Sequence, residues 1–301
     1  MARSARRASS ASPVVAGVPI THPDKLMFPQ LGVTKLDIAS YYAAVGRWML
    51  PHLKGRPLTL VFCPTGVGAG CTYLRHTKVW GPTAIRRVRI QEKTKVGEYM
   101  IVDTLEALVS LAQMNVIEIH TWNSTINRVE QPDRIILDLD PGKHVVWPQV
   151  LAAAREVRSL LTAIKLKAWV KTTGGRGLHI VLPIRPDHDW SECLEFARAI
   201  ATLMVEQHPD RYTTDFRKAG RDDKILIDYL RNNRTNTSIC AFSVRAREGA
   251  PVSMPVDWAD LKSSLKPERF SLQSAAAYLA RRRVDPWRDY WKSRQQLKLP
   301  A

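Results

Sequence analysis

The sequence predicts an α+β fold in which an antiparallel sheet carries the functional residues. Short runs such as 135–141 alternate in polarity or are continuously apolar, as strands do. Two such runs within 167–183 flank a glycine-rich turn, which is typical of a β-hairpin. Amphipathic segments with helical spacing, such as 147–161, lie between the strands. With 301 residues, the chain can bury a full core as one large domain or two smaller ones.

Both helices predicted in the N-terminal half start at a threonine, whose side chain can accept a hydrogen bond from the first helical turn. Thr34 precedes 36–50, where apolar side chains recur at roughly helical spacing, and Thr104 begins a helix that ends at Met114. The strands predicted in this half are 57–63, 100–102 and 117–121.

The C-terminal half is predicted to alternate strands with helices. The helices are expected at 147–161, 191–206 and 271–282, and the strands at 135–141, on both sides of the glycine turn, at 224–232 and at 241–248. Residues 241–248 alternate, so Ser243, Arg245 and Arg247 are expected to share one face of that strand.

The charge balance points to a polyanionic partner. There are 45 lysines and arginines against 28 aspartates and glutamates, a formal net charge of +17. No stretch approaches the roughly 20 apolar residues of a membrane span, so nucleic acid is favoured over an acidic membrane surface. Residues 1–17 lack the apolar core of a secretory signal and are expected to form a flexible basic tail or linker.

The four cysteines show neither a C-x-x-C pair nor the spacing of a zinc site. Reduced, buried thiols in a cytoplasmic protein are therefore expected. These cysteines are Cys63, Cys71, Cys193 and Cys240.

Three aspartates are candidate metal ligands. Asp138 and Asp140 alternate with apolar residues, so in a strand both carboxylates project from the same face. Asp228 interrupts a strongly apolar strand, where a carboxylate is costly unless it is paired, protonated or bound to metal. Oxygen ligands favour Mg²⁺ or Mn²⁺. Taken alone, the Asp138 and Asp140 pair is equally compatible with two aspartates that face water at a strand end.

The glycine turn and a group of arginines are candidate phosphate ligands. Three glycines between 174 and 177 let the backbone approach a ligand, and Arg176 adds charge. His179 lies on the outgoing strand. Arginines 231, 234, 245 and 247 could pair with a triphosphate. An ordinary hairpin and a solvated basic strand face are the simpler interpretations.

Other candidates carry little information when taken alone. Lys25 and Lys35 would normally be surface charges, and His120 at a strand end would normally be structural. Tyr73 begins a stretch that mixes aromatic and basic residues, including Lys78 and Trp80, and could contact bases and phosphates. A half-buried hairpin would have a similar sequence.

The order of four motifs resembles the polymerase domain of the bacterial ligase D proteins of non-homologous end joining, in the archaeo-eukaryotic primase superfamily. The motifs are IILDLDP, TTGGRGLH, KILIDYLRN and AFSVRARE, and HPDKLMFP, RPLTLVFCP and EIHTWNS extend the resemblance from about residue 18 to the end. The resemblance implies a primase-polymerase fold. A catalytic RRM-like antiparallel half at 131–301 would pack with an N-terminal α/β half at 18–130 that carries a DNA-end-binding loop, in a single domain.

The resemblance also implies roles for individual residues. Asp138, Asp140 and Asp228 would be catalytic and hold two Mn²⁺ or Mg²⁺ ions. His120, Thr173, Arg176, His179, Arg231, Thr237, Arg245 and Arg247 would bind the nucleoside triphosphate. Lys25 and Lys35 would grip a 5′-phosphate across a DNA gap, and Tyr73 would stack near the templating base. Thr173 and Arg176 stand where the family turn usually has Ser and Lys, and Thr72 replaces the first of two usual aromatics.

The expected function is therefore addition of nucleotides, preferably ribonucleotides, to a primer 3′-hydroxyl at gaps and broken DNA ends. Expected partners are DNA ends, the ligase and nuclease domains of a ligase D and a Ku-type end-binding protein, in the bacterial cytoplasm at the nucleoid. No K-x-D-G adenylation motif occurs, so ligase activity is expected outside this chain. A metal-dependent nuclease or phosphoesterase and a non-catalytic DNA-end-binding module are the alternatives.

Overall fold

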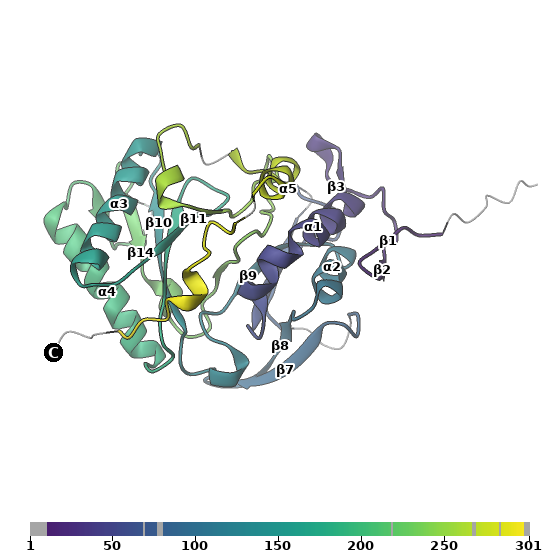
Figure 1. Ribbon diagram of the computed structural model, residues 1–301, viewed down its shortest axis with the longest axis horizontal. Coiled ribbons are helices and arrows are strands. Elements are labelled where there is room, and N and C mark those ends of the chain that lie inside the picture. The colour runs from purple at the N-terminus through teal and green to yellow at the C-terminus, as the bar shows by residue number, and fades with distance from the viewer. Residues whose placement is uncertain are drawn as a thin grey trace, which may run out of the picture.

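The computed structural model describes residues 11–68, 70–76, 81–217, 219–266, 269–282 and 284–297. Lys78 and Trp80 lie outside these ranges, as do residues 1–10 of the expected tail. No helix within the described ranges is long and apolar enough to cross a membrane. Two helix-covered sheets lie side by side (Figure 1).

The C-terminal half is built on a six-stranded sheet in the order β13, β14, β10, β12, β11, β16. Neighbouring strands are antiparallel except β13 and β14. The helices α3 (Trp147–Ala163) and α4 (Trp190–Gln207) cover one face of this sheet (Figure 1). The strands are β10 Arg134–Pro141, β11 Trp169–Thr172, β12 Leu178–Pro183, β13 Tyr212–Thr213, β14 Ile225–Asp228 and β16 Pro255–Val256.

Alternation along β10 divides core from site. Ile135, Leu137 and Leu139 belong to the main core together with residues of α3 such as Val157. The side chains between them, including Asp138, therefore project from the opposite face of the sheet. The predicted strand and its polarity are confirmed.

The N-terminal half has a four-stranded sheet in the order β15, β9, β5, β6, with two helices and a separate hairpin of β7 and β8. Its helices are α1 Lys35–Leu53 and α2 Leu105–Gln113, and its strands are β3 Leu26–Phe28, β4 Val33–Thr34, β5 Leu58–Phe62, β6 Thr72–Leu74, β7 Arg86–Gln91, β8 Val96–Ile101 and β9 Val116–Thr121. Both predicted helix caps are confirmed, since Thr34 and Thr104 accept hydrogen bonds from Asp37 N and Ala107 N.

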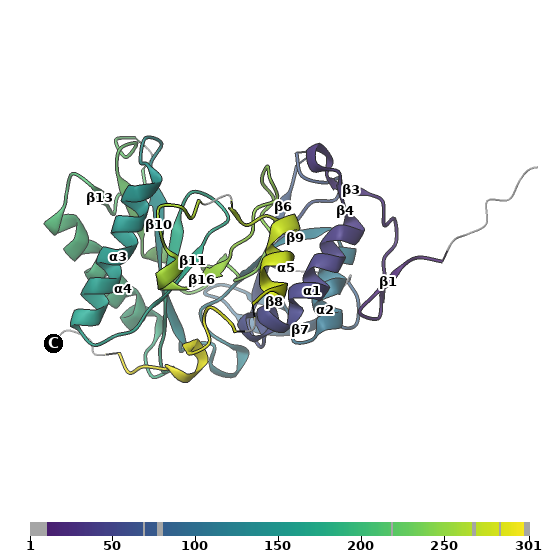
Figure 2. The same ribbon diagram turned by 45° about the horizontal axis from the view of Figure 1, so that its top comes forward.

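Two segments from the C-terminal half return to the N-terminal half. Strand β15 (Ser238–Ile239) pairs with β9, and α5 (Leu272–Ala280) packs against α1 (Figure 2). At the junction, the guanidinium of Arg56 binds both carboxylate oxygens of Asp133 at 2.7 Å. The two halves are therefore joined by strand pairing and a buried ion pair.

Three expectations are corrected by the structure. Within the tail expected at 1–17, β1 (Val14–Val15) pairs with β2 (Val18–Pro19), so ordered backbone starts earlier than predicted. The strand expected at 241–248 is absent from this described segment, which forms turns with a single bridge from Val244 to Val252. Backbone hydrogen bonds to residues 251–253, and two bonds to β9 described below, hold this segment instead.

The third correction concerns the cysteines. Cys63 and Cys71 form a disulfide with their Cα atoms 4.4 Å apart, whereas Cys193 and Cys240 are free and buried. Cys63 follows β5 and Cys71 precedes β6, and antiparallel pairing of these strands places the two cysteines opposite each other. The expectation of four reduced thiols is therefore wrong. It missed the bond because the proximity of Cys63 and Cys71 comes from strand pairing and is not visible in the cysteine spacing.

Candidate active site

Most of the predicted site residues line one pocket of about 280 Å³. They come from both halves of the chain. Some lie on strands, and others lie on the irregular segments that follow β14 and β15. The lining residues are Tyr73, His120, Asp138, Asp140, Thr173, Arg176, Gly177, His179, Arg231, Thr237, Ser238, Ile239, Arg245 and Arg247. Of the remaining predictions, Asp228 adjoins the pocket, while Lys25 and Lys35 belong to a separate region.

Strand register sets the floor of the pocket. Asp138 is the Cα partner of Asp228 on β14 and of His179 on β12, and His179 is in turn the partner of Lys171 on β11. Directly opposite residues share a face of an antiparallel sheet. A row of lysine, imidazole and two carboxylates therefore crosses four neighbouring strands.

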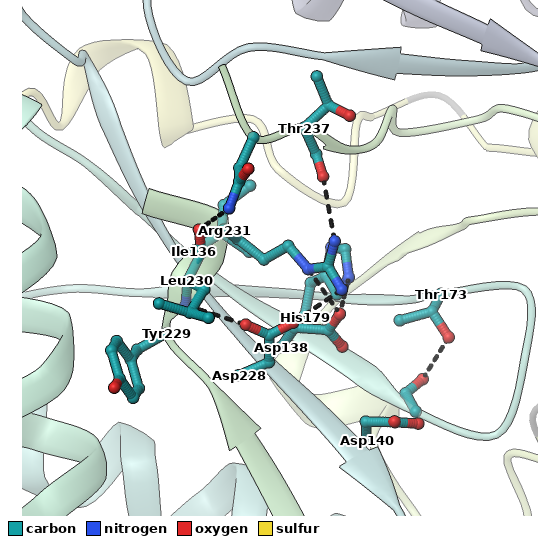
Figure 3. A network of polar contacts seen from close by, with 12 residues as sticks. Ile136, Asp138, Asp140, Thr173, His179, Asp228, Tyr229, Leu230, Arg231 and Thr237 are labelled. Carbon is teal, nitrogen blue, oxygen red and sulfur yellow. Dashed lines mark hydrogen bonds and ion pairs between the residues drawn. The ribbon is translucent and has the colours of Figure 1, made fainter. Parts of the chain in front are cut away.

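The guanidinium of Arg231 lies over the two aligned carboxylates (Figure 3). Its Nη2 is 2.7 Å from Asp228 Oδ2 and its Nε is 3.4 Å from Asp138 Oδ2. On the other side of the guanidinium, Nη1 donates to the carbonyl of Thr237 at 3.4 Å. His179 Nε2 lies 3.3 Å from Asp138 Oδ2. One arginine thus contacts both members of a buried pair of like charges and reduces their repulsion.

Asp140 has a different partner. Its half-exposed carboxylate accepts a hydrogen bond from Arg221 Nη2 at 2.7 Å. In Figure 3 it lies apart from the group formed by Asp138, Asp228 and Arg231. Among the residues that the structure describes, no group of three or more His, Cys, Asp or Glu side chains is arranged to hold a metal ion. The three predicted ligands lie on the neighbouring inner strands β10 and β14, each in contact with a guanidinium.

The surroundings give the two opposed carboxyls different pKa values. Burial opposes ionisation of Asp138, but His179 and Arg231 hold its pKa below its usual value. Burial raises the pKa of Asp228 to about 6, with Arg231 opposing the rise and Asp138 adding to it. Burial also lowers the pKa of His179 to about 4, and the charge of Lys171 acts in the same direction. At neutral pH His179 is therefore uncharged.

The glycine turn is shaped around two arginines. A Cβ on Gly174, whose φ is +67°, would lie 2.6 Å from Arg245 Cγ. A Cβ on Gly175 would lie 2.7 Å from Arg247 Nη1. Arg245 Nη1 also donates to the carbonyl of Thr173 at 2.7 Å. The turn thus approaches two protein side chains closely, while its approach to a ligand stays a prediction.

Two further residues of the pocket rim lie near these arginines. Arg176 donates from Nη2 to the carbonyl of Val145 at 2.7 Å, which directs it along the rim. Tyr73 is 68% exposed, with its ring centroid 6.2 Å from that of His120. An exposed aromatic ring at the mouth of a basic pocket can stack on a base.

Lys25 and Lys35 meet outside the pocket. Lys35 N donates to the carbonyl of Lys25 at 2.8 Å, which brings the two residues together. The Lys25 ammonium donates to the carbonyl of Pro64, and the Lys35 ammonium to that of Gln113 at 3.1 Å. Burial, and then the charge of Lys25, lowers the pKa of Lys35. Two adjacent cations held by backbone carbonyls could bind an added anion.

Three residues of the site were not identified from the sequence. Arg221 gave no signal, because its contact with Asp140 spans 81 positions. Lys171 interrupts an apolar strand as Asp228 does, and is only 3% exposed. Its Nζ donates to Ser253 Oγ at 2.7 Å, and burial lowers its pKa to about 7. Glu118 shares a strand face with His120, so its place beside the pocket could have been inferred from alternation.

Comparisons with known proteins identify related sequences. The family described as LigD, primase-polymerase domain, matches residues 34–287. The multifunctional non-homologous end joining protein LigD of Pseudomonas aeruginosa is 36% identical over 300 residues, covering 98% of this chain and 36% of that protein. The bifunctional non-homologous end joining protein LigD of Bacillus subtilis is 26% identical over 290 residues, covering 96% and 46%. The chain thus spans less than half the length of either relative.

A solved structure has the same fold. The polymerase domain from Mycobacterium tuberculosis ligase D, in complex with DNA, superimposes with a TM-score of 0.83 and 28% identity. The match covers 91% of this chain and 97% of the other. The predicted α+β architecture is therefore confirmed as that of a primase-polymerase domain.

Proposed function

The chain belongs to the LigD primase-polymerase domain family, and from this premise we propose that it adds nucleotides to primer 3′-hydroxyls at gaps and broken ends of DNA in non-homologous end joining. One observation carries the proposal. Two carboxylates on β10 and four arginines line one pocket of about 280 Å³. A lining that contains both charges suits a metal-bound triphosphate, because its cations bind carboxylates and its phosphates bind guanidiniums.

Asp138, Asp140 and Asp228 would hold two divalent ions, Mn²⁺ or Mg²⁺. Their donors are all oxygen, as these ions prefer. Arg231 and Arg221 now occupy the three carboxylates as ion-pair partners, so metal binding would require both guanidiniums to turn away. When bound, the ions would lower the pKa of the primer hydroxyl and neutralise the departing pyrophosphate.

The remaining pocket residues would hold the nucleotide. Arg231, released from the carboxylates, would join the other arginines of the pocket on the triphosphate, since guanidinium forks pair with phosphate oxygens. Thr173 and the uncharged His179 offer neutral hydrogen-bonding groups. Thr237 is our candidate for contact with the ribose 2′-hydroxyl and for a preference for ribonucleotides. These neutral and charged residues would be His120, Thr173, Arg176, His179, Arg231, Thr237, Arg245 and Arg247.

The N-terminal half would recognise the DNA. Tyr73 would stack near the templating base, and Lys25 and Lys35 would bind a 5′-phosphate on the far side of a gap. We further propose that residues 18–301 form one polymerase domain that works with ligase and nuclease domains and a Ku-type end-binding protein, in the bacterial cytoplasm at the nucleoid.

Two other functions fit parts of the site. A metal-dependent nuclease would use the same carboxylates, but it has no need of arginines placed to hold a triphosphate. A non-catalytic end-binding module would explain the net charge of +17, but not two carboxylates aligned across β10 and β14. Nucleotide addition explains both features.

The test is pyrophosphate release on a gapped duplex bearing a 5′-phosphate, with Mn²⁺ and each of the four ribonucleotides. We expect release and primer extension together, loss of both in Asp138→Ala, and slower extension with deoxyribonucleotides. Shortening of the primer without pyrophosphate would favour the nuclease. No metal-dependent reaction of any kind, with normal DNA binding, would favour the end-binding module.

A further inference from the structure

Glu118 is a buried carboxylate behind the pocket. It lies on β9, is 4% exposed, and does not itself line the pocket. Three positive or N–H groups converge on it. His120 Nε2 is 2.8 Å from Oε2, Arg245 Nε is 3.1 Å from Oε2, and Ala246 N donates to Oε1 at 2.8 Å. Burial opposes its ionisation, yet His120 and Arg245 lower the pKa of Glu118 to about 2.

The carboxylate determines which nitrogen of His120 carries hydrogen. An ionised carboxylate can only accept, so Nε2 must donate. Burial lowers the pKa of His120, although Glu118 opposes the shift, and this favours the neutral ring. A neutral ring that carries its proton on Nε2 has a bare Nδ1. His120 is thus held as a hydrogen-bond acceptor, the form that can bind a hydroxyl group.

The same carboxylate fixes the arginine segment. Residues 241–248 form no strand. Two hydrogen bonds that each use one side chain connect this segment to β9. Ile119 N donates to Ser243 Oγ at 2.9 Å, and Ala246 N donates to Glu118. Arg245 is then held at two points, with Nε beside Glu118 and Nη1 on the Thr173 carbonyl. Its remaining nitrogen is left for a ligand in the pocket.

We propose that Glu118 is a positioning residue for nucleotide binding, which fixes the acceptor form of His120 and the orientation of Arg245. The inference rests on the proposed function but concerns a residue that touches neither nucleotide nor metal. If Glu118 had only a structural role, its loss would lower the stability of the fold without a selective increase in the KM for nucleotide. The two roles therefore predict different kinetics.

Glu118→Gln tests the proposal, because the amide keeps the shape but presents N–H hydrogens to groups that are already donors. Glu156→Gln is the matched control. Glu156 also binds a histidine and an arginine, at 3.2 Å from His208 Nε2 and 3.3 Å from Arg211 Nη2, but it lies on α3 outside the pocket. Both variants should lose stability, measured as Tm.

We expect Glu118→Gln to raise the KM for nucleotide about tenfold or more while kcat changes less than about threefold. The dissociation constant for ATP with Mg²⁺, measured by calorimetry, should rise in parallel, and ¹⁵N spectra should show His120 losing its single tautomer. Glu156→Gln should change none of the three. Equal KM values in wild type and Glu118→Gln, or equal effects in the two variants, would overturn the proposal.

Failure of the proposed function would be recognised separately. In that case wild-type protein would release no pyrophosphate on a gapped duplex. The binding and tautomer measurements would still decide the role of Glu118, since neither requires turnover. An unchanged ATP affinity together with an unchanged His120 tautomer in Glu118→Gln would then reject it.

Discussion

The pocket beside β10 and the lysine pair near the start of α1 both gather charge, but they hold it differently. In the pocket, Asp138 and Asp228 share one guanidinium and are almost removed from water. In the lysine pair, like charges lie together and are held only by backbone carbonyls. To act, the pocket must release ion pairs between its own side chains, whereas the lysine pair must turn from backbone carbonyls to an incoming phosphate, with Lys35 only 4% exposed. We infer that chemistry and DNA-end recognition are separable.

Asp140→Ala should give the largest difference between the effect on nucleotide addition and the effect on DNA binding. Loss of a proposed metal ligand should reduce nucleotide addition by about 10³-fold or more, while DNA affinity stays equal or rises slightly because a negative charge has gone. Single-turnover extension and fluorescence anisotropy measure the two effects. Near-normal extension by this variant would remove Asp140 from the site. Asp215→Ala is a control, since this exposed carboxylate pairs with Arg217 outside the pocket.

Lys171 belongs to the row of lysine, imidazole and two carboxylates that crosses four strands. Its buried ammonium should make the stability of the protein depend on pH. The folded protein holds this proton only below about pH 7, whereas the unfolded chain holds it to about pH 10. Below pH 7 the buried ammonium of Lys171 lowers the free energy of unfolding by its full amount. As pH rises above 7, the folded protein releases this proton and the destabilisation declines. Between pH 7 and 9 wild type should gain about 2 kcal/mol in free energy of unfolding relative to Lys171→Met. Parallel urea-denaturation curves at all pH values would contradict this.

The disulfide should affect the lysine region more than the chemistry of the pocket, although Cys71 lies two residues before Tyr73. Cys63–Cys71 encloses a short loop whose Val67 N donates to the Met27 carbonyl at 2.7 Å, next to Lys25. Replacing both cysteines with serine should cost about 2 kcal/mol of stability by the loop-closure relation. Discrimination between 5′-phosphate and 5′-hydroxyl gaps should weaken a few-fold, while the extension rate at saturating DNA is unchanged. A lower saturated rate would show that the regions are coupled.

Lys25→Ala should change DNA binding without a loss of fold stability. One lost phosphate contact should weaken binding to a 5′-phosphorylated gap about tenfold and reduce the slope of log affinity against log salt by about one unit. A 5′-hydroxyl gap should bind almost as in wild type. Binding titrations at several salt concentrations measure both quantities. Equal weakening on both gaps would mean that Lys25 contacts DNA without reading the 5′ end.

The sequence predicted features that depend on residues close together in the chain, and it missed features that depend on contacts between distant residues. Alternation placed Asp138 and Asp140 on one face, and the threonine caps located two helices, because these features are local. The Cys63–Cys71 bond depends on pairing of β5 with β6, which cysteine spacing does not reveal. The segment 241–248 alternates like a strand, but it forms a loop that Glu118 and the Ile119 amide bind through Ala246 N and the Ser243 hydroxyl. Long-range contacts overrode the local pattern there.

One measurement tests the separation of the two regions most directly. Saturated extension rate and gap affinity, each with and without a 5′-phosphate, are compared in wild type, Asp138→Ala and Lys25→Ala. We predict that Asp138→Ala loses the rate but keeps the preference for the phosphate, and that Lys25→Ala loses the preference but keeps the rate. If either variant loses both, chemistry and end recognition are not separable.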